Sequence, residues 1–97
     1  MNIQAIKHLA LPIFKKHRIV RASLFGSATR DDATTKSDVD FLVELPSDVH
    51  GFDYVALKAD LKEDLQESLK KDVDVVEFSL VKPELKPYIL PTQIRIL

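Results

Sequence analysis

The chain contains no cysteine, which excludes disulfides, thiolate-bound metals and cysteine catalysis. It also lacks the glycine-lysine-serine/threonine phosphate loop and the glycine-rich dinucleotide turn, so neither a Walker-type NTPase nor a Rossmann oxidoreductase is indicated. No apolar run approaches the ~18 residues that a membrane span needs, and the N-terminus has no apolar region typical of a signal peptide. We therefore expect a cytoplasmic protein that does not engage a membrane.

The 97 residues carry a formal net charge of −1, so we expect no direct binding of nucleic acid. The charges are unevenly distributed, because residues 1–30 hold six basic and no acidic side chains whereas residues 31–97 hold eight basic and fifteen acidic ones. A phosphate ligand could bind between the basic and acidic parts, and chance segregation of solvated charges explains the pattern equally well. The length predicts a single domain over residues 1–97.

Hydrophobic periodicity divides the chain into alternating helices and strands. The predicted elements, in chain order, are a helix at 2–17, strands at 19–25 and about 38–45, a helix at 53–70, a strand at about 72–78 and a short helix at 83–90. Pro12 lies inside the first helix and is expected to kink or split it, because proline has no backbone donor. The order α-β-β-α-β-α predicts an α/β fold of the two-layer α+β type, with a small mixed sheet flanked by helices.

The second predicted strand carries two acids at alternate positions, Asp38 and Asp40. Alternate side chains of a strand share a face, so the two carboxylates point the same way. The opposite face is apolar and suits a core: Val39, Phe41, Val43 and Leu45. Two carboxylates this close repel each other, and Mg2+ would relieve the repulsion because it prefers oxygen ligands. The alternative is a pair of exposed acids on the rim of the sheet.

The third predicted strand repeats the pattern with Asp72 and Asp74. If it pairs beside the second strand, Asp74 or Asp72 can face the same site. Three carboxylates on neighbouring strands are what phosphoryl transfer with two metal ions requires. For Asp72, an exposed acid at the start of a strand is the favoured interpretation.

Gly26 and Ser27 directly follow the first predicted strand. Glycine lets the backbone approach a phosphate closely, and serine adds a hydroxyl donor. Arg30 and Lys36 in the next loop could pair with phosphate oxygens. An ordinary turn followed by solvated loop charges is the alternative.

Nucleophilic hydrolysis is not indicated. Ser23 and Ser27 have no obvious histidine and acid partners. The histidines do not cluster at the spacing of metal ligands, and we expect them at the surface or in loops: His8, His17 and His50.

These motifs together resemble the minimal nucleotidyltransferase family, the small branch of the DNA polymerase β-like superfamily. The resemblance rests on three runs and their spacing, and it covers nearly the whole chain: Leu24-Phe25-Gly26-Ser27, ten further residues, Asp38-Val39-Asp40-Phe41-Leu42-Val43, and Val73-Asp74-Val75-Val76. It implies the nucleotidyltransferase fold and a Mg2+-dependent enzyme. Asp38 and Asp40 would bind Mg2+, in a site for two ions, and Asp74 would be the third acid.

The resemblance also implies how ATP is held. Gly26 and Ser27 would bind the β- and γ-phosphates, and AMP would be transferred while pyrophosphate leaves. Family members usually read Gly-Ser-x-Ala-Arg-Gly here, and Arg30 matches the arginine as a nucleotide-binding residue. Asp31 stands in place of the final glycine and adds negative charge near the triphosphate.

The small size makes the chain similar to the antitoxin half of prokaryotic HEPN/MNT toxin–antitoxin pairs, because there is no room for a second domain that holds the acceptor. The resemblance implies transfer of AMP from ATP to a tyrosine of a partner HEPN ribonuclease toxin, which neutralises the toxin in a hetero-oligomer. One alternative is an antitoxin that acts by binding alone. Another is a nucleotidyltransferase that modifies a small molecule.

Overall fold

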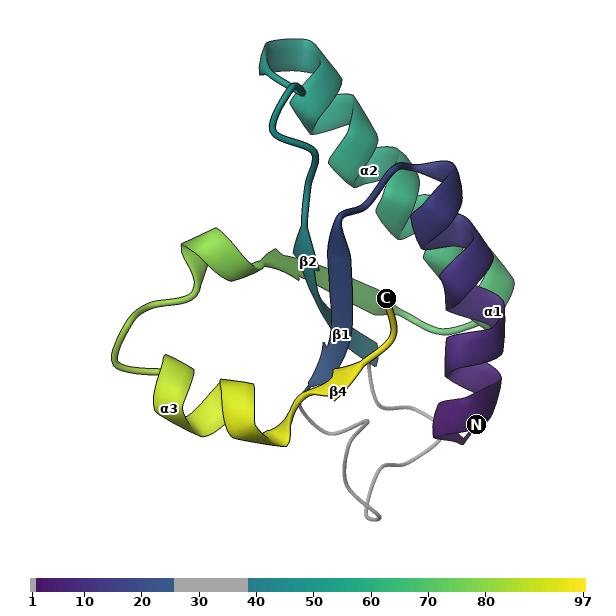
Figure 1. Cartoon of the computed structure of the whole chain (residues 1–97). Coiled ribbons are helices and arrows are strands. Elements are labelled where there is room, and N and C mark those ends of the chain that lie inside the picture. The colour runs from purple at the N-terminus through teal and green to yellow at the C-terminus, as the bar shows by residue number, and fades with distance from the viewer. Residues whose placement is uncertain (1, 26–38) are drawn as a thin grey trace.

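The structure, a computed structural model, describes residues 2–25 and 39–97 (Figure 1). Its elements follow in chain order: α1 (Ile3–Lys16), β1 (Arg21–Phe25), β2 (Val39–Glu44), α2 (Gly51–Leu69), β3 (Val73–Glu77), the 3-10 turn η2 (Phe78–Leu80), α3 (Lys86–Ile89), the 3-10 turn η3 (Leu90–Thr92) and β4 (Ile94–Arg95). Within the described residues, no helix has the length and apolar character needed to cross a membrane.

The four strands form one mixed sheet in the order β3-β2-β1-β4. β1 pairs antiparallel with both β2 and β4, whereas β2 and β3 run parallel and are connected through α2. This architecture confirms the predicted fold class. The prediction ended at the last helix and missed β4, because two residues are too few for alternation to reveal a strand.

Helices α1 and α2 lie side by side on one face of the sheet (Figure 1). Phe14 of α1 and Phe41 of β2 meet edge to face in this layer, with ring centroids 5.2 Å apart. The buried apolar side chains form one cluster: Ile6, Ala10, Phe14, Ile19, Ala22, Leu24, Val39, Phe41, Val43, Leu61, Leu65, Leu69, Val73 and Ile96. The α2 members recur every four residues, as expected for a helix that buries one stripe.

Helix α1 is continuous through Pro12, so of the two expected effects of the proline the split does not occur. Proline removes one backbone hydrogen bond, but Pro12 lies on the exposed side of the helix, where water can satisfy the freed carbonyl. The opposite side buries Ile6 and Phe14 on either side of the proline, which holds both halves on the sheet. Asn2 caps the first turn, because its side-chain oxygen accepts a hydrogen bond from the Ala5 amide at 2.8 Å.

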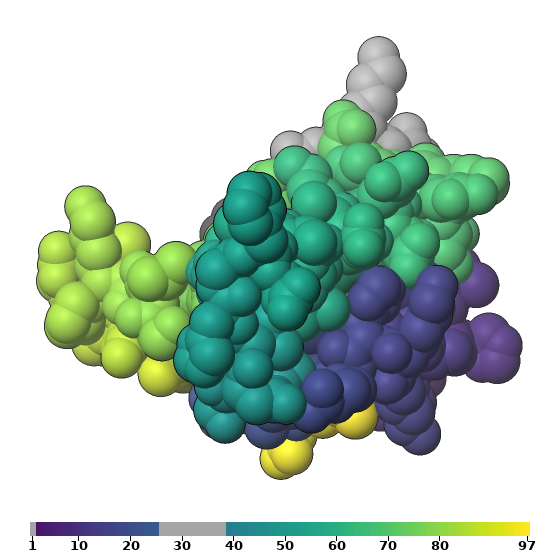
Figure 2. Space-filling view, turned by 90° about the horizontal axis from the view of Figure 1, so that it is seen from above, coloured from purple at the N-terminus to yellow at the C-terminus, as the bar shows by residue number. Residues whose placement is uncertain are grey.

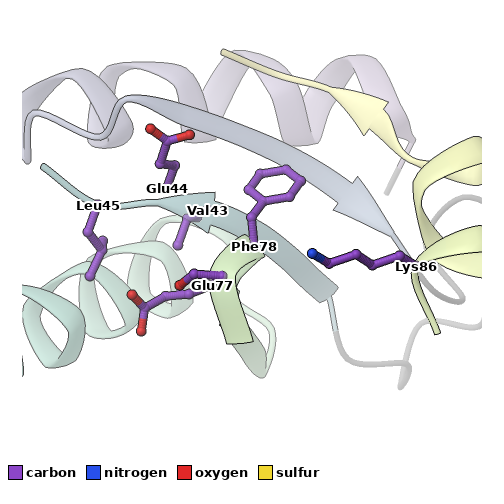
Figure 3. Close-up of a pocket in the computed structure, with 7 residues that line it drawn as sticks. Val43, Glu44, Leu45, Glu77, Phe78 and Lys86 are labelled. Atoms are coloured by element: carbon purple, nitrogen blue, oxygen red, sulfur yellow. The ribbon is translucent and has the colours of Figure 1, made fainter. Parts of the chain in front are cut away.

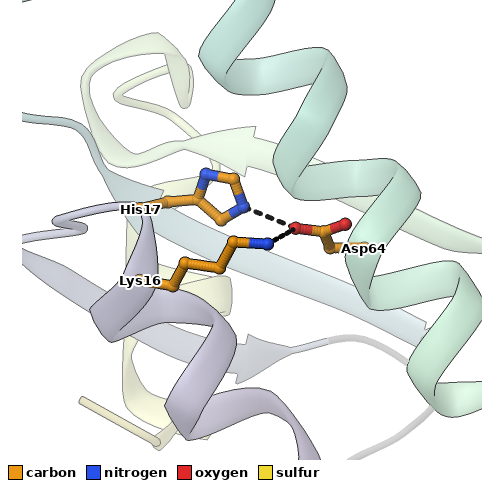
Figure 4. A network of polar contacts seen from close by, with 3 residues as sticks. All are labelled: Lys16, His17 and Asp64. Carbon is orange, nitrogen blue, oxygen red and sulfur yellow. Dashed lines mark hydrogen bonds and ion pairs between the residues drawn. The ribbon is translucent and has the colours of Figure 1, made fainter.

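The C-terminus of α1 is tied to α2 by a polar cluster of three side chains (Figure 4). Lys16 Nζ and His17 Nε2 lie 3.1 and 2.7 Å from the same carboxylate oxygen of Asp64. The hydrogen bond from His17, followed by that from Lys16, lowers the pKa of the Asp64 carboxyl. His17 lies in the turn after α1, which is one of the two expected environments, but its side chain is only 12% exposed because it packs against α2. Its partner is 47 residues away, which local sequence reasoning could not identify.

The lowered pKa predicts a stability contribution from Asp64 that depends on pH. The folded-state value lies below the ordinary 3.8, so the contribution is complete above about pH 4 and is lost as the pH falls through the lowered pKa. Asp64→Asn should therefore lower the melting temperature at about pH 5.5, and the difference from wild type should shrink towards about pH 2.5. Asp60→Asn, an exposed acid on the same helix, is the control. A difference in melting temperature between Asp64→Asn and wild type that does not change with pH would contradict the lowered pKa of Asp64.

Core packing supplies a second prediction. Phe41 is fully buried, so Phe41→Ala should lower the free energy of unfolding by about 3–5 kcal/mol through lost burial and a new cavity. Phe52→Ala removes the same ring from a side chain that is 93% exposed, and should change stability by less than about 0.5 kcal/mol. Urea denaturation of both variants measures the contrast, and equal losses would refute the described core.

Candidate functional site

The two described acids of the predicted site lie opposite each other on neighbouring strands. Asp40 of β2 is the register partner of Asp74 of β3, and on its other side Asp40 is the partner of Phe25, the last residue of β1. Alternation places this row on the face of the sheet turned away from α1 and α2, because Val39 and Phe41 belong to the helix-covered core. Asp40 is half-buried and Asp74 is exposed. The row therefore reaches solvent at Asp74.

The remaining predicted site residues lie outside the described part of the chain: Gly26, Ser27, Arg30 and Asp38. The two described residues that flank this segment, Phe25 and Val39, are nevertheless defined. Gly26 follows Phe25, and Asp38 precedes Val39, so both ends of the segment join the sheet at the carboxylate row. The sheet therefore brings Phe25, which directly precedes the glycine-serine run in sequence, and the two described carboxylates to one end of the strands.

Neighbouring strands are about 4.7–4.9 Å apart, so two carboxylates facing each other across one such gap repel. A bound cation relieves this repulsion, and oxygen donors from one or two carboxylates are what Mg2+ accepts in proteins. Asp40 and Asp74 therefore fit Mg2+ by type and by placement. The described residues hold no cluster of three or more histidine, aspartate or glutamate side chains around one point. The third carboxylate of the prediction, Asp38, is not among them.

The face that carries Asp40 is not polar along its whole length. Leu42 is fully buried, and its register partner Ser23 on β1 is 2% exposed. The turn η2, which follows β3 directly, contacts β2. The apolar floor beside the carboxylate row is thus closed to solvent.

The segment after β3 connects one end of the sheet to the other. It leaves β3 at Glu77, passes through η2, α3 and η3, and enters β4, where Ile94 pairs with Leu24. Figure 1 shows β4 beside β1. Leu24 is adjacent to Phe25, so the segment ends one residue pair away from the carboxylate row. Arg21 anchors its start, because the guanidinium lies 3.9 Å from the centre of the Phe78 ring.

The far end of the sheet holds a buried acid, Glu77, that sequence reasoning missed. Glu77 is 8% exposed and accepts a hydrogen bond from the Tyr54 hydroxyl, while Lys58 Nζ lies 3.5 Å from the same oxygen. The hydrogen bond to Glu77, with burial as the second cause, raises the pKa of Tyr54. A cavity of about 430 Å³ lies beside it, lined by ends of β2 and β3, by η2 and by Lys86 (Figure 3). Glu77 thus joins the end of β3 to α2 through a phenol and a cation.

Solved structures share this fold. A structure described provisionally as a minimal nucleotidyltransferase superimposes with a TM-score of 0.79 at 29% identity, over 97% of this chain and 95% of that one. A toxin–antitoxin structure with AMP-PNP gives 0.74 at 19% identity, over 94% of this chain and 72% of that one. A tri-AMPylated Shewanella oneidensis HEPN toxin in complex with MNT antitoxin gives 0.68 at 19% identity, over 97% and 71%. The fold is that of minimal nucleotidyltransferases.

Sequence comparison identifies the family. A Methanocaldococcus jannaschii protein, provisionally named a protein adenylyltransferase, is 40% identical over all 97 residues of both chains. The family described as "Polymerase beta, Nucleotidyltransferase" matches residues 10–97, which include the whole candidate site. The chain therefore belongs to the polymerase β nucleotidyltransferase family.

The two tyrosines provide a matched test of the Glu77 assignment. Tyr54→Phe removes the hydroxyl donor to a buried carboxylate and should cost about 1–3 kcal/mol of unfolding free energy. Tyr88→Phe removes the same atom from a side chain that is 76% exposed, and should cost less than about 0.5 kcal/mol. Denaturant titration of both proteins compares them, and a neutral Tyr54→Phe would show that Glu77 does not depend on this donor.

Proposed function

We propose that this chain is a Mg2+-dependent protein adenylyltransferase that transfers AMP from ATP to a tyrosine of a partner HEPN ribonuclease toxin and thereby neutralises it. The observation that carries the proposal is the register pair of Asp40 and Asp74 at the open end of the sheet. Family membership supports nucleotidyl transfer, and the full-length relative from M. jannaschii supports a protein as the acceptor.

Three carboxylates are assigned to the metal: Asp38, Asp40 and Asp74. Bound there, Mg2+ would neutralise the charge that develops on the phosphate oxygens during transfer. Asp40 is half-buried and lies in the middle of the row, so it suits the central place among the three metal ligands. Asp74 is exposed on the outer side of the row and suits the approach of the acceptor, whose phenolic proton it can accept.

The phosphate contacts are assigned to the segment that joins β1 and β2. Gly26 begins this segment directly after Phe25, so a phosphate held by the Gly26 and Ser27 amides lies beside the carboxylate row. Arg30 would pair with phosphate oxygens as a charge-assisted donor. ATP bound in this way would direct its α-phosphorus towards the side of the row from which the acceptor tyrosine approaches.

The transfer itself is an in-line displacement. The tyrosine oxygen attacks the α-phosphorus, the bond from that phosphorus to the bridging oxygen of the β-phosphate breaks, and pyrophosphate leaves with the bond electrons. The chain contributes chiefly orientation. Holding the acceptor and the triphosphate in place makes a bimolecular step effectively unimolecular. An open carboxylate row admits an acceptor carried by another protein.

The choice of partner is supported by the solved structures that share the fold, one of which contains a HEPN toxin carrying AMP together with its MNT antitoxin. Exposed apolar side chains on the segment after β3 are suited to contact such a partner: Leu80, Leu85 and Tyr88. Binding through this surface would place the partner near the carboxylate row, where the segment ends.

The carboxylate assignment predicts the effect of neutral, equally sized side chains. Asp40→Asn and Asp74→Asn should each reduce transfer of labelled AMP to the partner toxin by about 10²–10³-fold or more, because the metal loses a charged ligand. Asp53→Asn, an exposed acid in the first turn of α2, should leave the rate unchanged. Circular dichroism confirms that each variant is folded.

The same variants separate catalysis from binding. If Asp40→Asn retains the wild-type transfer rate, the assigned chemistry is wrong. If Asp40→Asn abolishes transfer but still neutralises the toxin fully, the chain neutralises by covering its partner. That outcome would overturn the proposed mode of neutralisation.

A further inference from the structure

The two tyrosines of the chain lie in opposite environments. The Tyr54 hydroxyl is engaged with the buried Glu77 carboxylate and is half-buried against the body of the protein. Tyr88 in α3 is 76% exposed, so its phenol is accessible to a second molecule. An enzyme that acts on tyrosine therefore carries one accessible tyrosine of its own.

The position of Tyr88 favours presentation to another molecule. The segment from η2 to η3 projects as a separate lobe, green to yellow in Figure 2, at one side of the body. Prolines stiffen this lobe at Pro83, Pro87 and Pro91, and α3 itself has only four residues. A short, stiff projection can enter the open site of a second copy at little cost in conformational entropy.

Charge also suits such an encounter. Lys82 and Lys86 are exposed near Tyr88 and outnumber the single acid between them, Glu84. The carboxylate row offers the opposite charge through Asp74, which is exposed. The acceptor lobe of one copy is therefore attracted to the site of another.

We propose that Tyr88 accepts AMP from the nucleotidyltransferase site of a second copy of this chain. The inference rests on the proposed function, because it uses the same site and the same chemistry. The Tyr88 oxygen forms a bond to the α-phosphorus of ATP, the bond from that phosphorus to the β-phosphate bridging oxygen breaks, and pyrophosphate leaves. The phenolic proton passes to a carboxylate of the site or to water.

The experiment uses the full chain with Mg2+ and α-labelled ATP, without any partner. Wild type should acquire label on Tyr88, located by peptide mass spectrometry. Tyr88→Phe should lose at least about nine-tenths of the label, whereas Tyr54→Phe, tested at a temperature at which it is folded, should retain it. Retention of label by Tyr88→Phe would overturn the assignment.

Mixing two variants tests transfer between copies. Asp40→Asn supplies an acceptor tyrosine without a working site, and Tyr88→Phe supplies a working site without the acceptor. Label should appear on the Asp40→Asn chain only when both are present. Label on wild type that is absent from the mixture would show transfer within one chain and would refute transfer to a second copy.

A parallel reaction with the HEPN toxin as acceptor separates this inference from the proposed function. If the wild-type chain labels the toxin and its Tyr88 acquires no label, the inference is wrong and the proposed function stands. If neither the toxin nor Tyr88 acquires label, both are wrong.

Discussion

The parallel pairing of β2 with β3 is the constraint on which the rest of the structure depends. Its register sets Asp40 opposite Asp74, and a slip of one residue would turn one of the two carboxylates into the core. Helix α2 fixes this register from one face by burying a stripe of leucines against the sheet. A backbone hydrogen bond also fixes the register where the two strands begin, because the Val39 amide donates to the Asp72 carbonyl at 3.0 Å.

The hydrophobic core and the candidate site therefore lie on opposite faces of the same strands. On β2, Phe41 packs on Phe14 of α1, while Asp40 beside it in sequence faces the other way. The buried Leu42 closes the face next to the carboxylate row, so polar chemistry is confined to one end of the sheet. The acid at the far end, Glu77, is hydrogen-bonded instead to Tyr54 of α2.

The fold class was predictable because helical and strand periodicities are local properties, and because the spacing of the motifs is typical of one family. The facing of Asp40 and Asp74 followed from alternation once the two strands were assumed to be neighbours, and the structure contains that pairing. The metal and nucleotide roles of the site residues stay predictions. β4 and the contact of His17 with Asp64 were missed, because each depends on a partner far away in sequence. The continuity of α1 through Pro12 depends on burial, which propensity does not report.

The most direct test of the shared carboxylate site is a double-mutant cycle on the apparent affinity for Mg2+ at a fixed ATP concentration. Asp40→Asn, Asp74→Asn and the double variant are compared with wild type by calorimetric titration. If the two carboxylates hold one ion, the double variant should lose less binding free energy than the sum of the single losses, by about 0.5–3 kcal/mol. Losses that add to within about 0.3–0.5 kcal/mol would show that the two carboxylates act independently, and would contradict the account.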